Sequence, residues 1–456
     1  MSRYTNIKMR VLPYENKMVL ALNPALAKHL LISNEEHIRL SLGQKQLTIR
    51  LIYRQVDEKE LFISQSVFDY FNIPLEGHLM LVNYIVQSKV LSLGPIIAIM
   101  TDFFEMADQS PPHFRTIHQF CQEINQTVEL LGGIAYVCHP KDIKETEVHG
   151  YLNIEGEWKK QLLPLPDVIY NRVHSRKIES SPSFTNLKNL LYKNAIPFFN
   201  EQFLSKKDVY DFLFDETHLR TYLPETDVYS KEQLLYFIEK YPSIFIKPVN
   251  GSQGKQIIHI RKNKDVYTVG YSSGKKAKKI HPFHDIDSFI SQFEKEHSTS
   301  NYIIQEGIAL IQLNKRPIDF RILCHKNRQN IWKVTSAVAR ISNAEQFVSN
   351  LAQGGEMRKP LALLTTLFDK TTAIQLLALM KEISIELCTM IDQKTFGLYG
   401  ELGIDIGVDY EGQLWMIEAN SKPSKQIDGE FEFNQIRPSA RALVEYCTFL
   451  AFSTRQ

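Results

Sequence analysis

Two carboxylates near the C-terminal end of the chain are spaced so that they could bind a metal ion. Asp405 and Glu418 lie in the stretch ELGIDIGVDYEGQLWMIEAN, whose central Glu-Gly dipeptide is typical of a hairpin turn. A turn centred there places Asp405 opposite Glu418, and two like charges so placed repel unless a cation lies between them. Because carboxylate and amide oxygens are ligands of Mg²⁺ in proteins, Asp405, Glu418 and Asn420 are candidate metal ligands. A solvated acidic hairpin is the competing interpretation.

The same hairpin is predicted to have an apolar side and a polar side. A turn at Glu411-Gly412 also pairs Tyr410 with Gln413, and strand alternation sorts the other side chains onto two faces. The predicted apolar face carries Ile404, Ile406, Val408, Trp415, Ile417 and Ala419. The predicted polar face carries Asp405, Asp409, Glu418 and Asn420. We therefore expect one side to face a core and the other to bear the chemistry.

A glycine-rich loop follows a β-branched strand in SIFIKPVNGSQGKQIIHI. The strand ends near Lys247, the loop contains Gly251, Ser252 and Gly254, and a second apolar strand follows. Glycines let backbone N–H groups approach phosphate oxygens closely, and a lysine neutralises their charge. The strand–loop–strand order excludes a P-loop and a Rossmann turn, since both continue into a helix. On this motif alone, a phosphate-binding loop and a plain glycine-rich hairpin tip both stay open.

A third polar motif ends the strand in YIIQEGIAL. The strand reaches Gln305 and Glu306 and then bends at Gly307. Its backbone groups could hydrogen-bond a base such as adenine. A strand that simply ends at a glycine is the simpler interpretation of the motif by itself.

Two arginines lie on strands between these motifs. In PIDFRIL, alternation puts Asp319 and Arg321 on one face, and WKVTSAVARIS brings Arg340 to a strand end. A guanidinium group binds carboxylate or phosphate through two parallel hydrogen bonds. The competing interpretation is a solvated Asp–Arg pair on the surface of a sheet.

The composition is that of a globular protein with about two to four domains. The chain has 456 residues, of which 44% are hydrophobic and 23% charged, and its net charge of +2 requires neither a nucleic acid nor a membrane partner. MSRYTNIKMR lacks the apolar core of a signal peptide, and charges interrupt LALLTTLFDKTTAIQLLALM, so we expect no membrane span. The five cysteines are scattered without a CxxC pair, which favours a reducing cytosol over a cysteine zinc site.

Hydrophobic patterns divide the chain into three parts. Residues 1–90 contain many short apolar–polar alternations, which predict a β-rich module. LGPIIAIMT reads as a buried strand, a helical pattern after it stops at Gly132, and further strands follow, so we expect a small α/β domain over 93–198. From 199 to 450 short strands alternate with longer helices, as in an α+β domain.

The order of these motifs resembles the ATP-grasp superfamily. The residues that carry the resemblance are Lys247-Pro, Gly251-Ser-Gln-Gly254, Gln305-Glu306, Asp319-Phe-Arg321, Arg340, Asn350, Gly354-Gly355, Asp405 and Glu418-Ala-Asn420. Within that superfamily the chain is similar to the YheC/YheD-like endospore coat-associated branch. The segments similar to that branch are LGPIIAIMT, PLPDVIYNRV, FLSKKDVYDFL and IEANSKPS.

The resemblance implies an α+β fold in which two α+β subdomains clasp ATP together with Mg²⁺. A pre-ATP-grasp α/β domain (93–198) and the β-rich module (1–90) would precede an ATP-grasp domain over 199–450. The nucleotide lid would lie at about 225–305 and the metal-binding subdomain at about 306–450.

The resemblance also assigns expected roles to matching residues. The positions expected to bind the nucleotide are Lys206, Lys247, Gly251, Ser252, Gly254, Gln305, Glu306 and Ile308. The positions expected to stabilise the transferred phosphoryl group are Arg321 and Arg340, and the expected Mg²⁺ ligands are Asp405, Glu418 and Asn420. Lys206 has a second lysine, Lys207, beside it, which leaves the register of that motif open. The chain departs from the superfamily at Ser421-Lys422-Pro423-Ser424, where many ligases have a Ser-Pro-Gly turn.

The implied activity is that of an ATP-dependent carboxylate–amine ligase. A carboxylate attacks the γ-phosphate of ATP to give an acyl phosphate, and an amine then displaces phosphate to form an amide. The expected partners are small-molecule or peptide carboxylates and amines, in a cytoplasmic protein associated with the spore coat or envelope. Two alternatives stay open: a kinase of the same fold that phosphorylates a hydroxyl group, and a non-catalytic ATP-binding protein of the spore coat.

Overall fold

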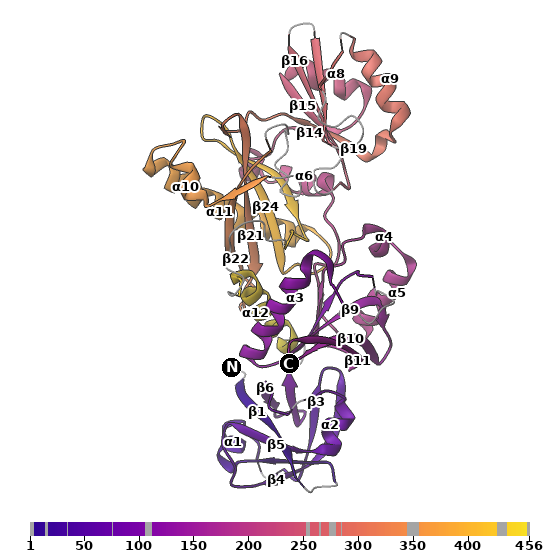
Figure 1. The fold of residues 1–456 in the computed structure, drawn as a ribbon, viewed down its shortest axis with the longest axis vertical. Coiled ribbons are helices and arrows are strands. Elements are labelled where there is room, and N and C mark those ends of the chain that lie inside the picture. The colour runs from indigo at the N-terminus through magenta and orange to yellow at the C-terminus, as the bar shows by residue number, and fades with distance from the viewer. Residues whose placement is uncertain are drawn as a thin grey trace.

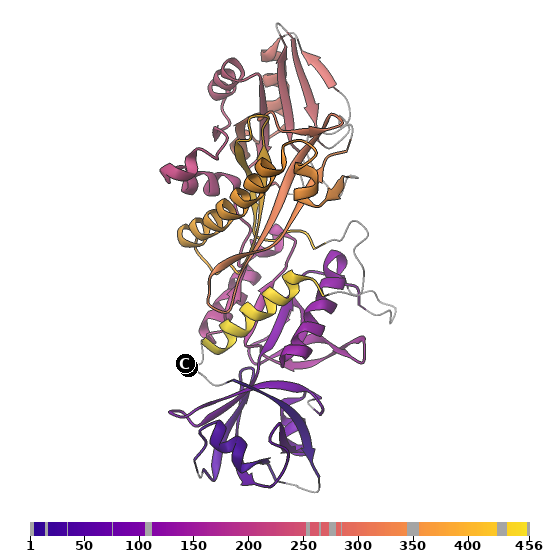
Figure 2. The same cartoon turned by 90° about the vertical axis from the view of Figure 1, so that its left-hand side faces the viewer.

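The computed structural model describes residues 4–13, 17–33, 35–74, 76–104, 112–251, 256–263, 266–272, 280–283, 285–343, 355–425 and 436–453. Four units are stacked along the long axis in Figure 1, and Figure 2 shows the same stack from the side. The sheet farthest from the N-terminal barrel comes from the middle of the chain, so the chain runs up the stack and returns. Near the start and end of the described chain, the rings of Tyr4 and Phe452 lie 4.5 Å apart.

The first unit is a closed barrel with strand order β1-β5-β2-β4-β3-β7-β6. Its strands are β1 (Thr5–Leu12), β2 (Val19–Leu22), β3 (His37–Leu42), β4 (Lys45–Tyr53), β5 (Glu60–Ser64), β6 (Leu79–Ile85) and β7 (Val90–Gly94). Its helices are α1 (Pro24–His29) and α2 (Gln65–Phe71). Alternate apolar side chains such as Leu20, Leu40 and Leu91 fill the interior.

The second unit is a six-stranded sheet with order β11-β10-β9-β8-β12-β13. Its strands are β8 (Ile96–Met100), β9 (Ile134–Ile143), β10 (Glu147–Ile154), β11 (Glu157–Pro164), β12 (Val168–Asn171) and β13 (Phe198–Phe199). Its helical segments are η1 (Arg115–Ile117), α3 (His118–Leu131), α4 (Arg176–Glu179) and α5 (Pro182–Lys193). The predicted strand in LGPIIAIMT is β8, which is buried throughout and parallel to β9 and β12. The predicted helix is α3, and it ends at Gly132 as expected.

The third unit, which we call the β14–β19 sheet, has the strand order β14-β19-β15-β16-β17-β18. Its elements are β14 (Thr226–Val228), α8 (Lys231–Lys240), β15 (Ser243–Pro248), β16 (Ile258–Asn263), β17 (Val266–Tyr271), β18 (Ile280–Phe283), α9 (Ile286–Glu296), η2 (Thr299–Asn301) and β19 (Tyr302–Glu306). The antiparallel pairing of β15 with β16 confirms the predicted strand–loop–strand order. Ser252 and Gly254 in the intervening loop, together with Asn350 and Gly354, lie outside the described residues.

The fourth unit, the C-terminal sheet, has the order β23-β22-β21-β24-β25, with β20 paired to β21. Its elements are α6 (Lys206–Phe214), α7 (Thr217–Arg220), β20 (Gln312–Leu313), β21 (Arg316–Lys326), β22 (Trp332–Ile341), β23 (Glu356–Arg358), α10 (Pro360–Leu364), α11 (Lys370–Lys394), β24 (Glu401–Val408), β25 (Leu414–Asn420) and α12 (Pro438–Ser453). Helix α11 covers one face of the sheet, and α12 packs between this sheet and α3. In the described part of the chain, no helix is long and apolar enough to cross a membrane.

The β24–β25 hairpin confirms one predicted pairing and corrects another. Asp405 does pair with Glu418, but Ile406 pairs with Met416, so Ile417 is the extra residue of a β-bulge. The predicted pairing of Tyr410 with Gln413 is wrong, because Gln413 instead closes a longer turn with Asp409. The Asp409 N–H donates to the Gln413 carbonyl at 3.1 Å, and the Asp409 carboxylate accepts from the Gln413 N–H at 2.8 Å.

The bulge also changes which side chains of β25 face the core. Leu414 and Met416 are buried against the C-terminal core, whereas the prediction had placed Trp415 and Ile417 there. The indole N–H of Trp415 donates to Asp409 at 2.9 Å, and Ile417 lines the cleft described below. Since strand alternation has a period of two, one inserted residue reverses the faces between the turn and the bulge.

Candidate functional site

A single cleft of about 1500 Å³ brings together every predicted site residue that the structure describes. Its lining comes from the β14–β19 sheet, the C-terminal sheet and the residues that follow β12 of the α/β sheet. The predicted residues that line it are Lys206, Lys247, Gly251, Gln305, Glu306, Ile308, Arg321, Arg340, Asp405, Glu418 and Asn420. Side chains separated by more than 200 positions in the sequence therefore face one space.

Strand alternation explains why the C-terminal sheet presents charge to this cleft. On β21, Phe320 and Ile322 are fully buried against α11, while Asp319 and Arg321 face the cleft, as predicted. On β24, glycines flank Asp405 two residues away on each side. A Cβ at Gly403 would lie 2.9 Å from Pro423, and one at Gly407 would lie 2.4 Å from Leu310. These glycines let neighbouring segments approach the sheet beside the carboxylate.

Asp405 is held by two arginines, one from the neighbouring strand β21 and one from β22 beyond it. Arg321 makes a two-pronged ion pair with it, and its Nη2 donates to Oδ2 at 2.8 Å. Arg340 Nη2 lies 2.8 Å from the same oxygen, while Arg340 Nε donates to Asp319 at 2.6 Å. Burial would raise the pKa of Asp405, but the two guanidinium groups outweigh it and hold that pKa below its usual value. Arg340, Asp319, Arg321 and Asp405 thus form a ladder of alternating charges across β22, β21 and β24.

Glu418 has a different cation, supplied by α6. Lys206 Nζ lies 3.0 Å from Glu418 Oε1 and donates to the Gly251 carbonyl at 2.8 Å. The neighbouring Lys207 instead pairs with Asp211 on the exposed side of α6, so the structure assigns the cleft position to Lys206. The repulsion between the paired carboxylates of Asp405 and Glu418 is thus reduced, because each has its own positive partner.

Lys247 lies beside this pair and is almost fully buried. Its ammonium group hydrogen-bonds to the Gln305 side chain, which in turn donates to Thr226 at 2.9 Å. Burial, with the nearby charge of Lys206, lowers the pKa of Lys247 to about 8. An anion that entered the cleft would stabilise the charged form of this lysine.

The residues predicted to hold Mg²⁺ fit the ion in part. Glu418 and Asn420 supply hard oxygen donors two residues apart on β25, and both side chains line the cleft. Asp405 is engaged by both arginines. Across the described residues, no group of three or more His, Cys, Asp or Glu side chains is placed to hold a metal by itself. This donor set suits an ion that arrives with phosphate ligands of its own.

A family model described as YheC/D-like ATP-grasp matches residues 195–450, which include the C-terminal sheet, the β14–β19 sheet and most of the cleft. The chain belongs to this family. Its fold is accordingly the α+β ATP-grasp fold that the order of the motifs predicted.

Among curated proteins, the YheC/D-like chain is 27% identical over 419 residues to the endospore coat-associated protein YheD of Bacillus subtilis, covering 91% of each chain. It is 24% identical over 283 residues to YheC of the same organism, covering 60% of this chain and 76% of YheC. Among solved structures it is similar to the VanG D-Ala:D-Ser ligase from Enterococcus faecalis, with a TM-score of 0.46 and 11% identity over 78% of this chain and 99% of that one.

At the end of this YheC/D-like cleft beside β19, where a base is expected, one backbone group is already engaged. The Glu306 N–H donates to the Glu225 carbonyl at 2.9 Å, so a base could use the Glu306 carbonyl but not its N–H. Phe245 stacks on His259 with ring centroids 4.4 Å apart, which gives this end an aromatic wall. Burial lowers the pKa of His259 to about 3, so its ring is neutral at pH 7.

The cleft also contains cations that sequence reasoning missed, and they come from the α/β unit and from the segment after β25. They are Arg172, Arg176, Lys422, Lys425 and Arg437. One signal was available: Arg172 directly follows the buried strand in PLPDVIYNRV, and residues just beyond the carboxyl ends of parallel strands commonly bind ligands. Nothing local indicated that α12 and the segment after β25 would meet that strand.

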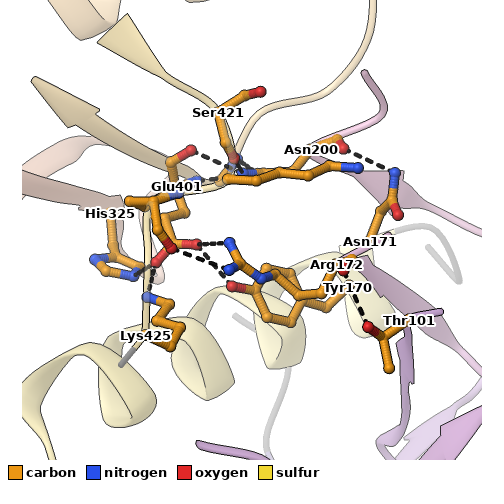
Figure 3. A network of polar contacts seen from close by, with 12 residues as sticks. Thr101, Tyr170, Asn171, Arg172, Asn200, His325, Glu401, Ser421 and Lys425 are labelled. Atoms are coloured by element: carbon orange, nitrogen blue, oxygen red, sulfur yellow. Dashed lines mark hydrogen bonds and ion pairs between the residues drawn. The ribbon is translucent and has the colours of Figure 1, made fainter. Parts of the chain in front are cut away.

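Figure 3 shows the polar contacts that Glu401 makes behind the cleft wall, with Arg172 and Lys425 among its partners. Glu401 is fully buried on β24, accepts from Tyr170 at 2.6 Å and from Lys425, and lies 2.9 Å from Nε2 of His325. Arg172 Nη1 lies 3.6 Å from the same carboxylate. Burial would raise the pKa of Glu401, but the charges of Lys425 and Arg172 and the contact with His325 outweigh it and hold the pKa far below its usual value. One carboxylate thus joins the α/β unit to the C-terminal sheet.

Proposed function

We propose that the protein is an ATP-dependent ligase that joins a carboxylate to an amine through an acyl phosphate. The observation that carries the proposal is the ladder of Asp319, Arg340, Asp405 and Arg321 beside the lysines of the same cleft. Phosphoryl transfer needs positive groups fixed around a group whose negative charge spreads in the transition state. Membership of the YheC/D-like ATP-grasp family supports ATP as the phosphoryl donor.

In this proposal the nucleotide lies along the β14–β19 sheet. The Glu306 carbonyl and the Ile308 backbone would hold the base, against the wall formed by Phe245 and His259. Lys247 and Lys206 would bind phosphate oxygens, and the loop from Gly251 through Ser252 and Gly254 would cover them. Because Lys247 is buried and bonded only to the neutral Gln305 side chain among the described residues, a phosphate would give its ammonium group a charged partner.

The metal proposed is Mg²⁺, held by Glu418 and Asn420, with Asp405 as the third candidate. When bound with ATP it would supply positive charge that neutralises the phosphate oxygens. Lys206 already neutralises Glu418 in the free protein, so this ion pair must open as the nucleotide enters.

In this proposal the protein's own side chains position the reacting groups and neutralise their charge. A substrate carboxylate oxygen forms a bond to the γ-phosphorus as the bond to the leaving ADP oxygen breaks. Arg321 and Arg340 orient and neutralise the transferred phosphoryl group. An amine then bonds to the acyl carbon, inorganic phosphate leaves, and the amine loses a proton. No side-chain nucleophile is required for this sequence.

The division of the chain is also a proposal. Residues 93–198 would form the pre-ATP-grasp domain and 199–450 the ATP-grasp domain, with its lid at about 225–305. The names of YheD and YheC support an association with the endospore coat, which we propose here as well.

The proposal is tested by incubating the full chain with ATP, Mg²⁺ and a metabolite extract and searching by mass spectrometry for new amides. We expect ADP, free phosphate and an amide to form together. Glu418→Gln should abolish ADP formation, whereas Glu411→Gln, on the exposed turn of the same hairpin, should not change it. A phosphorylated product without free phosphate would indicate a kinase, and full turnover by Glu418→Gln would contradict the metal assignment.

A further inference from the structure

Arg176 is a cation of the cleft wall that the proposed reaction does not yet use. It is the first residue of α4, in the segment after β12, and the Ser175 side chain caps this helix by accepting from the Ile178 N–H at 3.3 Å. The guanidinium carbon of Arg176 lies 4.4 Å from the centroid of the Phe203 ring. A guanidinium group stacked on an aromatic ring is held in place while its N–H edge stays available to a ligand.

The contacts of Arg176 place it at the proposed phosphate region. Its Nη1 donates to the Asn250 side chain at 3.4 Å, and its Nη2 donates to the Leu204 carbonyl at 3.3 Å. Asn250 precedes Gly251 in the loop that is proposed to cover the phosphates, and Lys206 donates to the Gly251 carbonyl at 2.8 Å. The same short loop therefore accepts one hydrogen bond from a cation of the α/β unit and another from a cation of α6.

Arg176 has no carboxylate partner among the described residues. Its two hydrogen bonds go to neutral oxygens. Burial lowers the pKa of Arg176, and the charges of Glu179 and Glu418 act against this effect from beyond ion-pair distance. Each of these carboxylates already has a lysine, since Glu179 pairs with Lys422 and Glu418 lies 3.0 Å from Lys206. The positive charge of Arg176 is therefore left for an anion that enters the cleft.

The charges around Glu418 do not balance in the free protein. Its carboxylate interacts with Lys206 directly and with Lys247 and Arg176 at longer range. The repulsion among these cations appears at Lys247, whose pKa falls to about 8 through burial and through the charge of Lys206. Three cations thus share one carboxylate, and the phosphates of a nucleotide would neutralise the excess.

The order of groups along the cleft favours the terminal phosphate as the ligand of Arg176. The base is proposed to lie against Phe245 and His259, and Lys247 lies on the same strand as Phe245. Glu418, a proposed ligand of Mg²⁺, belongs with the last two phosphates, because metal ions in phosphoryl-transfer sites bridge those groups. Arg176 interacts with Glu418 and comes from the α/β unit, not from the sheet that carries the base wall.

Resting on the proposed ligase function, we infer that Arg176 binds the terminal phosphate of ATP and holds it for transfer. The phosphate replaces the neutral oxygens of Asn250 and Leu204 as acceptors, and the new hydrogen bonds are charge-assisted, which makes them shorter and about twice as strong. Because α4 belongs to the α/β unit, that unit takes part in nucleotide binding. One of its residues then distinguishes ATP from ADP.

Calorimetric titration of the full chain with two nucleotides in the presence of Mg²⁺ tests the inference. ADP lacks the terminal phosphate, whereas the β,γ-imido analogue of ATP has it but cannot transfer it. In Arg176→Gln we expect the affinity for the imido analogue to fall on the order of tenfold, as the loss of one charge-assisted contact predicts, and the affinity for ADP to change less than about twofold. Unchanged ADP binding also shows that the variant is folded.

Arg176→Lys keeps the charge without the forked geometry and should recover part of the loss. Arg220→Gln is the matched control, because Arg220 also stacks on a phenylalanine, at 4.2 Å from Phe214, and donates to a backbone carbonyl, but lies outside the cleft. Equal losses for both nucleotides in Arg176→Gln, or no loss for either, would overturn the inference. A loss confined to the imido analogue, in a protein that forms no amide, would leave this site standing and defeat the ligase proposal. Amide formation by the unaltered chain, with unchanged nucleotide binding in Arg176→Gln, would do the reverse.

Discussion

Replacing Asp405 with asparagine should destabilise the C-terminal sheet measurably while preserving its shape. The carboxylate is 6% exposed and bonded to both Arg321 and Arg340. Removing one partner of a buried ion pair typically costs ~3–5 kcal/mol, because the remaining charge is left without compensation. Arg340 keeps Asp319, and Arg321 is 18% exposed and can reach water, so we expect the low end of that range, about 3 kcal/mol.

Urea unfolding followed by tryptophan fluorescence measures this cost. Two of the three tryptophans, Trp332 and Trp415, lie in the C-terminal sheet. We expect the Asp405→Asn midpoint to fall without a change of slope. The control is Glu356→Gln on β23 of the same sheet, whose carboxylate is 40% exposed and paired to Arg358, and it should change stability by less than about 0.5 kcal/mol.

The pH dependence of the Asp405→Asn effect gives a second check. The pKa of Asp405 is lowered in the folded protein, so its contribution is complete above the unfolded-state value of about 4 and is lost as the pH falls further. The stability difference between wild type and variant should therefore shrink in acid. An Asp405→Asn protein as stable as the Glu356→Gln control at pH 7 would refute the ladder described here.

Two further predictions concern Lys247 and Glu401. Because the pKa of Lys247 is about 8 in the free protein and a bound phosphate would raise it, ATP affinity should fall about tenfold as the pH rises above 8. In Lys247→Arg, whose charge persists, calorimetry should find a flat profile, and equal slopes in both proteins would contradict the assignment. Glu401→Gln leaves Arg172 and Lys425 without their carboxylate and should cost more than Asp405→Asn, at about 5 kcal/mol in the same urea assay. A smaller loss than that of Asp405→Asn would show that these cations find other partners.

Local sequence patterns predicted the strands that carry the cleft residues. Alternation alone placed Asp319 and Arg321 opposite Phe320 and Ile322, because a half-buried strand repeats every two residues. The pairing of Asp405 with Glu418 was predicted correctly because two errors cancel. The turn is one residue longer than assumed, and the bulge at Ile417 adds one residue to β25. The pairing is therefore shifted by one residue between the turn and the bulge and is as predicted beyond it.

Contacts between distant parts of the chain could not be predicted in this way. The ion pair of Lys422 with Glu179 and the hydrogen bond from Tyr170 to Glu401 each join residues more than 200 positions apart. Such contacts depend on how the α/β sheet docks on the C-terminal sheet, which no local periodicity encodes. The cations around Arg172 in the cleft were missed for the same reason. The β10–β11 hairpin was missed because the alternation in its strands is weak.

The buried position of Glu401 has a mechanical consequence. Separating the α/β sheet from the C-terminal sheet would take Arg172 and Tyr170 away from the buried Glu401 carboxylate, which would keep Lys425. Arg172 would then be left without its carboxylate, which is costly for a buried cation. We therefore expect those two sheets to move together, and α12 adds to their connection because it packs against both. Any hinge that admits a nucleotide must then sit in the two connections to the β14–β19 sheet, near residues 224–226 and 306–310.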